Sequence, residues 1–265
     1  MNRFIRDRHL IWVFIAPSAI LFALFALPFF ALFERSIASD FFNYVFSEQA
    51  LKALRLSLVT STITTGVTII FGTPFAYLLA RWRFRFKSWL ELMIDLPIVL
   101  PPSVAGLALL IAFGRRGLFG STLNIIGISL PFTTAAVVLA QTFVAAPLYL
   151  RSARAGFAEV DKQLEEAAQV EGANQWQLFQ EVMFPLAGRA LLSGAILTWT
   201  RALGEFGATI LFAGNLEGIT QTMPMAIYLG FESELGIAIA LSVMLVGVSA
   251  LLLGIIRKLE KDEDR

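Results

Sequence analysis

Long uncharged apolar runs recur along this chain, and they constrain its fold more than any other feature. A helix needs about 20 apolar residues to cross roughly 30 Å of hydrocarbon, and it satisfies its own backbone hydrogen bonds on the way. With 57% hydrophobic and 15% charged residues, the sequence predicts an all-α membrane protein with six transmembrane helices. The expected spans are 10–33, 53–80, 93–113, 132–150, 186–212 and 236–256.

The basic residues predict the side of the membrane on which each connection lies, because cytoplasmic connections carry an excess of Lys and Arg. Most of the 21 basic residues lie in the tails 1–9 and 257–265, in the connection after the second run, or in the segment 151–185. Both termini and this segment are therefore expected in the cytoplasm of a multi-pass inner-membrane protein. The opposite connections hold Arg35, Lys52, Arg55, Arg115 and Arg116.

The residue types present exclude several classes of function. The chain has no Cys and a single His, His9 in the N-terminal tail, so we expect no metal site, no cofactor and no membrane enzyme. A nucleotide-binding Gly-x-x-x-x-Gly-Lys-[Ser/Thr] sequence does not occur, so the chain is not expected to hydrolyse ATP itself. The basic residues form no groove-sized patch, which argues against nucleic acid as a partner.

Helix-breaking residues gather in the second and third runs. The second run contains Gly66, Gly72 and Pro74 among many Ser and Thr residues, and the third opens with Pro97 and then Pro101 and Pro102. Such residues allow close helix packing, or local unwinding where neighbours satisfy the freed backbone. Packing alone explains any one of them, whereas together they suit a bundle that moves.

The segment 151–185 is the one long connection expected in the cytoplasm. Its sequence predicts two short, mainly acidic helices joined by a turn at Gly172 and closed by Pro185. Two interpretations stay open on physical grounds: docking into a groove of another protein, or packing as a solvated hairpin on its own bundle. The apolar faces of the two helices are expected at Val160, Leu164, Ala167 and Ala168, and at Trp176, Phe179, Val182 and Met183.

The same segment carries a spaced motif. It resembles the EAA loop of importer permeases, Glu-Ala-Ala, three residues, Gly, nine residues, Ile-x-Leu-Pro, with Val182 and Phe184 as apolar departures. The motif stands here as Glu166-Ala167-Ala168, Gly172 and Val182-Met183-Phe184-Pro185. In that family the loop is a coupling helix seated in a cleft of a separate ATPase subunit. The resemblance implies that this contact is made by Glu165, Glu166, Ala167, Ala168 and Gly172.

A second resemblance narrows the family. The stretches 100–106, 200–209, 213–215 and 220–224 look like the molybdate/tungstate permease group, over roughly residues 50–256. Sulfate permeases are more distant, with Tyr and Ser expected where Phe206 and Ala208 stand, and a permease for sulfate or thiosulfate is the alternative function. The likeness implies type I ABC importer permease architecture. It also implies a second copy of the permease, two cytoplasmic ATPase subunits that hold the ATP and Mg, and an extracytoplasmic oxyanion-binding protein.

Two opposite charges lie inside the fifth run. Arg201 and Glu205 are four residues apart, so they can pair along one helix face, and an unpaired charge in hydrocarbon costs several kcal/mol. They form either a pathway element, in which Arg201 attracts a dianion and Glu205 prevents a tight trap, or a structural ion pair. The other pathway candidates are Thr198, Thr209, Pro101 and Ser103.

The outward loop expected at 213–233 contains no Lys or Arg, so it predicts no fixed site for an anion. This suits an importer whose cargo is captured by a separate binding protein. A secondary anion transporter without ATP coupling would also explain the helix breakers and the ion pair, but it has no need of a docking hairpin. A purely structural membrane protein is disfavoured by the breakers and the charges in the fifth run.

Overall fold

Helices make up the regular structure of the described residues, 8–37 and 40–263, of this computed structural model, and no strand occurs among them. The expected all-α fold is confirmed for these residues. Most of the expected tail 1–9 and the last two residues of the tail 257–265 lie outside this part. In chain order the elements are α1 (Arg8–Ile37), α2 (Phe41–Val45), α3 (Glu48–Arg81), α4 (Lys87–Val99), α5 (Pro102–Phe113), α6 (Gly120–Ile125), α7 (Thr134–Glu159), α8 (Lys162–Val170), α9 (Gln175–Gln177), the π-helix η1 (Leu178–Met183), α10 (Phe184–Leu186), α11 (Gly188–Leu203), α12 (Gly207–Ala213), α13 (Met223–Ser233) and α14 (Leu235–Glu263).

Four of these helices, α1, α3, α7 and α14, are long and apolar enough to cross a membrane without a break. Two further crossings result if each of two bent pairs, α4 with α5 and α9–α10 with α11, counts as one span. The expected number of six crossings is reached on that count, as four continuous helices and two bent pairs. The bent pairs are the places where the sequence-based expectation needs correction.

The third span is not one straight helix. The axes of α4 and α5 differ by 118°, and the backbone between them is extended at Leu100 and Pro101, with ψ of 138° and 134°. Proline has no N–H for the helix and disfavours helical geometry in the preceding residue, so the Leu100-Pro101-Pro102 sequence ends one helix and starts the next. The prolines were evident in the sequence, but the size of the bend was not.

The fifth span and the outward loop also differ from the expectation. α11 bends by 69° from the helices before it. It ends at Leu203, and α12 starts only at Gly207. The second half of the expected outward loop, from Met223 to Ser233, is a helix, α13, which carries Pro224 in its first turn. Proline is favoured there because its missing N–H needs no partner in a first turn.

The segment 151–185 begins as a continuation of the fourth span, since α7 runs to Glu159. Its first short helix is α8. Its second combines α9, η1 and α10, and Pro185 lies in the first turn of α10 instead of ending the segment. We call residues 151–185 the coupling loop, after the family motif that they resemble.

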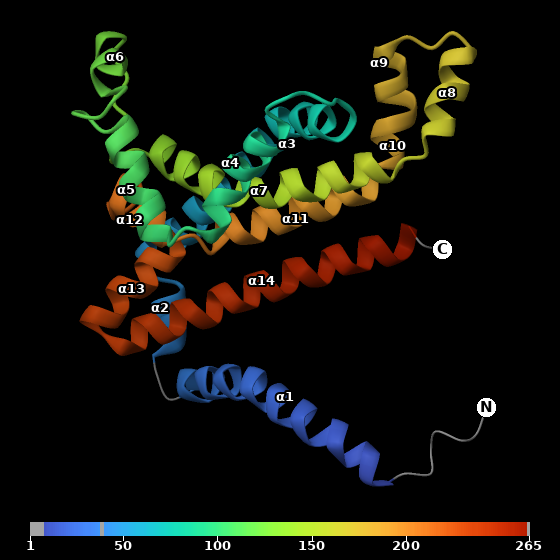
Figure 1. The fold of residues 1–265 in the computed structure, drawn as a ribbon. Helices are drawn as coiled ribbons and strands as arrows, with labels where there is room; N and C mark the ends of the chain where they lie inside the picture. The colour runs from blue at the N-terminus through green and yellow to red at the C-terminus, as the bar shows by residue number, and fades with distance from the viewer. Residues whose placement is uncertain (1–7, 38–39, 264–265) are drawn as a thin grey trace.

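Figure 1 shows how these parts are arranged. α7 and α11 lie side by side and pack closely with α3, while α5 packs on α12 and α13 on α14. α1 contacts α14 and otherwise stands apart from the rest of the chain. The start of α1, the end of α14 and the hairpin of α8 and α9 all lie at one end of the molecule.

Small polar side chains bring α3, α7 and α11 together. Ser57, Thr60, Ser61, Thr64 and Thr68 on one side of α3 are buried. The Thr64 hydroxyl donates to the side-chain oxygen of Gln141 in α7 at 3.0 Å, and the Gln141 amide donates to the carbonyl of Ala202 in α11 at 3.0 Å. Small residues allow helix backbones to approach in a membrane, and buried polar groups need such partners. Gln141 therefore joins all three helices.

The contact between α5 and α12 leaves no room for a side chain at Gly106. A Cβ there would lie 2.7 Å from the carbonyl oxygen of Ala208, whereas a Cβ at Gly66 in α3 would meet nothing within 4 Å. We expect Gly106→Ala to destabilise the detergent-solubilised protein by about 1–3 kcal/mol through overpacking. Gly66→Ala should be neutral or stabilising by up to about 1 kcal/mol, because Ala is the better helix former. Thermal unfolding of both variants checks this, and equal melting temperatures would contradict the tight contact.

Candidate functional site: the coupling loop and the buried ion pair

The turn of the coupling loop is fixed by local hydrogen bonds. The side chain of Asp161 caps the start of α8 by accepting from Gln163 N at 2.9 Å. After α8, Gly172 has φ of +90°, a conformation that side chains resist, and Ala173 N donates to Ala168 O at 3.0 Å. Asn174 then caps the next helix by accepting from the backbone N–H groups of Trp176 and Gln177. The predicted glycine turn is confirmed.

α8 has an inward and an outward face. Successive helical residues differ by about 100° in direction, so Glu165 and Ala168 share one face, and Glu166, Ala167 and Val170 share the opposite one. Glu165 and Ala168 are half-buried, whereas the other three are exposed, Val170 to 88%. The apolar face expected on this helix is therefore only partly right, because Leu164 and Ala167 do not pack on the bundle.

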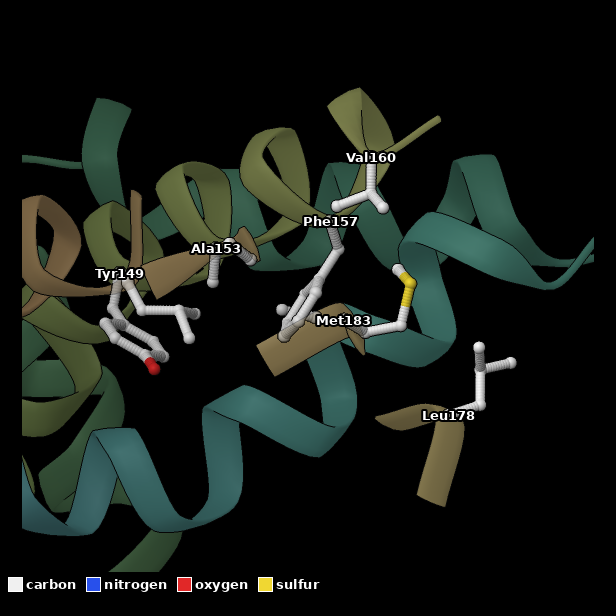
Figure 2. Packing of buried hydrophobic residues seen from close by; sticks show 9 residues of the cluster. Tyr149, Ala153, Phe157, Val160, Leu178 and Met183 are labelled. Atoms are coloured by element: carbon white, nitrogen blue, oxygen red, sulfur yellow. The ribbon is translucent and has the colours of Figure 1, made fainter. Parts of the chain in front are cut away.

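An apolar cluster beneath the hairpin holds the coupling loop on the bundle. Figure 2 shows Tyr149, Ala153 and Phe157 from the second half of α7 and Val160 just after it, together with Leu178 and Met183 from η1. Ala168 of α8 and Phe179 and Val182 of η1 pack against this cluster. The second expected apolar face is confirmed for Phe179, Val182 and Met183, while Trp176 remains 64% exposed.

The outer surface of the hairpin combines apolar side chains and negative charge. Glu166, Ala167, Val170 and Gly172 are all exposed, as is Trp176 on the second helix. Large exposed apolar side chains beside small residues are typical of a contact surface. Three of the five residues predicted to contact the ATPase, Glu166, Ala167 and Gly172, thus lie on the outer surface. Glu165 and Ala168 are directed toward the bundle.

The expected ion pair is present at the break of the fifth span. Arg201 Nη1 lies 2.6 Å from Glu205 Oε2, and Glu205 is only 1% exposed. The second carboxylate oxygen of Glu205 accepts from the backbone N–H of Ala208 at 2.8 Å. Glu205 therefore does two things, since it neutralises Arg201 and satisfies an N–H group in the first turn of α12.

The other pathway candidates are not all in one place. Pro101 and Ser103 are exposed at the start of α5, where α12 packs closely enough that a Cβ on Gly207 would lie 2.7 Å from Pro102. Thr198 is buried and donates to Ala145 O of α7 at 3.3 Å. Thr209 is buried too, and its hydroxyl has no hydrogen-bond partner among the described residues.

Two residues outside the predicted set make important contacts. Gln141 links three helices, and it could have been found as an amide within an apolar run, since such a group needs partners when buried. Arg81 contacts the coupling loop, but in the sequence it is one of several basic residues after the second run and has no distinguishing mark there.

The family described as "Binding-protein-dependent transport system inner membrane component" matches residues 72–264. The chain belongs to this family. It is a membrane transport component of an ABC importer and not an enzyme, with ATP hydrolysis carried out by a separate subunit. The recognition of an importer permease from the coupling-loop motif is thereby confirmed.

Individual relatives agree with this family. The chain is 41% identical over 241 residues to "Molybdenum transport system permease protein ModB" of Mycobacterium bovis, covering 91% of this chain and 90% of the relative. It is 33% identical over 224 residues to "Probable sulfate transport system permease protein cysT" of Chlorokybus atmophyticus, covering 83% and 78%. A bacterial ABC transporter involved in alginate import has a similar fold, with a TM-score of 0.77 at 16% identity over 96% of this chain and 95% of that one.

The double role of Glu205 predicts an order of stability among its variants. Glu205→Ala leaves Arg201 without its partner and Ala208 N without an acceptor, and the unmade hydrogen bond alone costs about 1–3 kcal/mol. Glu205→Gln removes the charge but keeps an oxygen that can accept from Ala208 N. We therefore expect the Ala variant to melt lower than the Gln variant in detergent, and both below the parent. Equal melting temperatures for the two would rule out the capping contribution.

Proposed function

We propose that this chain is the permease of an importer for molybdate, with tungstate as a second cargo of the same route. The observation that carries the proposal is the 41% identity, over 91% of the chain, to a permease named for molybdenum transport. The residues that resemble the molybdate/tungstate group support it, because Phe206 and Ala208 stand where sulfate permeases are expected to have Tyr and Ser. Phe206 lies against Tyr228, with ring centroids 5.3 Å apart.

We propose an assembly of two permease copies, two ATPase subunits that hold ATP and Mg, and an extracytoplasmic oxyanion-binding protein. The exposure of α1 supports a second copy, because no residue in the most apolar stretch of this helix is buried within the described chain. An apolar helix face of this size suits lipid on one side and protein on the other. The two copies then enclose the pathway between them.

We place the coupling loop and both termini in the cytoplasm. The excess of basic residues near these segments supports this orientation, and α8, the start of α1 and the end of α14 lie at one end of the molecule (Figure 1). The outward face of α8, with Glu166, Ala167 and Val170, is then the surface that enters a cleft of the ATPase. Small side chains allow close approach there, and Glu166 pairs with a base of the partner.

In the proposed cycle, ATP binding closes the two ATPase subunits and brings the two coupling loops together. The bundles then change from inward-open to outward-open and receive the anion from the binding protein. Arg201 is 34% exposed in its side chain while its partner Glu205 is buried. The guanidinium therefore has donors left for a passing dianion, whereas the carboxylate is engaged within the chain.

Sulfate is the second candidate cargo, favoured by the 33% identity to a sulfate permease. Molybdate, tungstate and sulfate are all tetrahedral dianions, so the distinction needs a competition experiment. The chain is reconstituted with its ATPase and binding protein, and uptake of labelled molybdate is measured with excess tungstate or sulfate. We expect ATP-dependent uptake that tungstate suppresses and sulfate does not. Suppression by sulfate would move the assignment to sulfate, and uptake without ATP would point to a secondary transporter.

The outward face of α8 gives a specific prediction for coupling. Glu166→Lys reverses the charge of an exposed residue without touching the bundle, so the protein should fold and insert normally. Uptake of molybdate and its stimulation of ATP hydrolysis should fall at least about tenfold, because a like charge then meets the basic partner. Glu159→Lys is the matched control, since Glu159 is also exposed in the coupling loop but lies at the end of α7. Normal uptake by Glu166→Lys would remove this residue from the contact.

A further inference from the structure

Arg81, the last residue of α3, contacts the coupling loop at three places: in α8, in η1 and at the residue that follows α7. One guanidinium nitrogen of Arg81 lies 2.6 Å from Glu165 Oε1 in α8 and donates to the carbonyl of Val160, just after α7, at 2.8 Å. The same nitrogen lies 3.8 Å from the sulfur of Met183 in η1. These three residues come from separate segments, so a single side chain ties them to the end of one membrane-spanning helix.

The position of Arg81 shields these contacts from water. Its side chain is 11% exposed and that of Glu165 is 17% exposed, so water screens this pair far less than a surface pair. A cation in the last turn of a helix is also favoured by the helix dipole. The planar guanidinium offers several donors in fixed directions, which a Lys ammonium at the same place does not reproduce.

One turn earlier on the same side of α3, Tyr77 makes the apolar part of the attachment. Its ring lies edge-on to Phe157 of α7, with centroids 5.4 Å apart, and to Phe179 of η1, at 5.1 Å. Neither ring belongs to α8. The aromatic contacts thus fix the base of the coupling loop, and the ion pair of Arg81 holds the helix that carries the exposed surface.

α8 has little else to hold it. Among the described residues, η1 is the element against which α8 mainly packs, and only Ala168 of α8 reaches the apolar cluster. In Figure 1, α8 stands at the outer edge of the hairpin, away from α7 and α11. Apart from its two-residue connection to α7, α8 is linked to a membrane-spanning helix among the described residues by the pair of Glu165 with Arg81.

We propose that Arg81 is a positioning residue that fixes α8 to α3 and carries a displacement of α8 into the membrane-spanning bundle. The proposal rests on the coupling function proposed above, and it changes the part played by Glu165, which acts within its own chain and not on the ATPase. Because α3 is joined to α7 and α11 through Thr64 and Gln141, a movement that reaches α3 reaches the core of the bundle.

The test compares Arg81→Gln and Glu165→Gln with variants of a second ion pair that does not involve α8. Arg154 and Glu91 are also 2.6 Å apart, but they join α7 to α4 and do not involve α8, so Arg154→Gln and Glu91→Gln serve as controls. The first measurement is hydrogen exchange of the backbone amides of 162–170 in the permease alone. We expect faster exchange there in Arg81→Gln and Glu165→Gln and unchanged exchange in both controls.

The second measurement is the amount of molybdate imported per ATP hydrolysed by the complete reconstituted complex. We expect a loss of about three- to tenfold in either single variant, with the subunits still co-purifying. The double variant should be no worse than the single ones, because both remove the same link. The Arg81→Lys variant should import more molybdate per ATP than Arg81→Gln but less than the parent.

The outcomes separate the two proposals. If exchange and coupling in Arg81→Gln and Glu165→Gln equal those of the parent, or if the losses of the two variants add, the positioning role is wrong while the transport function stands. If the parent complex imports no molybdate but 162–170 exchanges faster in both variants, the link is supported and the cargo assignment fails.

Discussion

In a bilayer the chain has to satisfy its own backbone hydrogen bonds, and the rest of this structure depends on how it does so. Helices solve the problem along most of the described chain, and the third and fifth expected spans are each interrupted by a short non-helical stretch, at Leu100–Pro101 and at Gly204–Phe206. These stretches are neighbours, because the starts of α5 and α12 pack on each other at Pro102 and Gly207. The first turn of α12 takes its acceptor from the buried carboxylate of Glu205. The second break is thus capped by a side chain of the same chain, and the charge of that side chain is neutralised by Arg201.

The polar contacts of α3 give the bundle its rigid part. Hydroxyl groups along this helix allow α7 and α11 to approach, and Gln141 satisfies the carbonyl of Ala202 close to the point where α11 ends. The same two helices, α3 and α7, extend beyond their apolar runs to Arg81 and Glu159. The coupling loop rests on these extensions, so the surface that meets a partner and the break at Glu205 belong to one connected set of helices.

The sequence predicts the long apolar helices well, because a run of about 20 apolar residues has few other uses. It predicts the coupling loop from a spaced motif, and the pairing of Arg201 with Glu205 from their separation. It does not predict the 118° bend at Pro101, since proline marks a break without setting its angle. Nor does it predict that α11 and α12 are separate helices, because the start of α12 depends on a hydrogen bond from its first turn to the side chain of Glu205. The contacts of Arg81 join residues about 80 and 100 positions apart, and no local pattern encodes them.

The two neighbouring acidic residues of α8 show why a motif alone is an incomplete guide to function. Glu165 and Glu166 have the same chemistry, but a rotation of about 100° directs one toward Arg81 and the other away from the bundle. The adjacent alanines divide in the same way, with Ala168 against the apolar cluster and Ala167 exposed. A contact surface has to be both exposed to its partner and fixed to its own chain. In α8, a helix of nine residues, neighbouring positions lie on different faces, so one position contacts the bundle while the next is exposed. The effect of a substitution therefore depends on the face that it alters and not on the residue type.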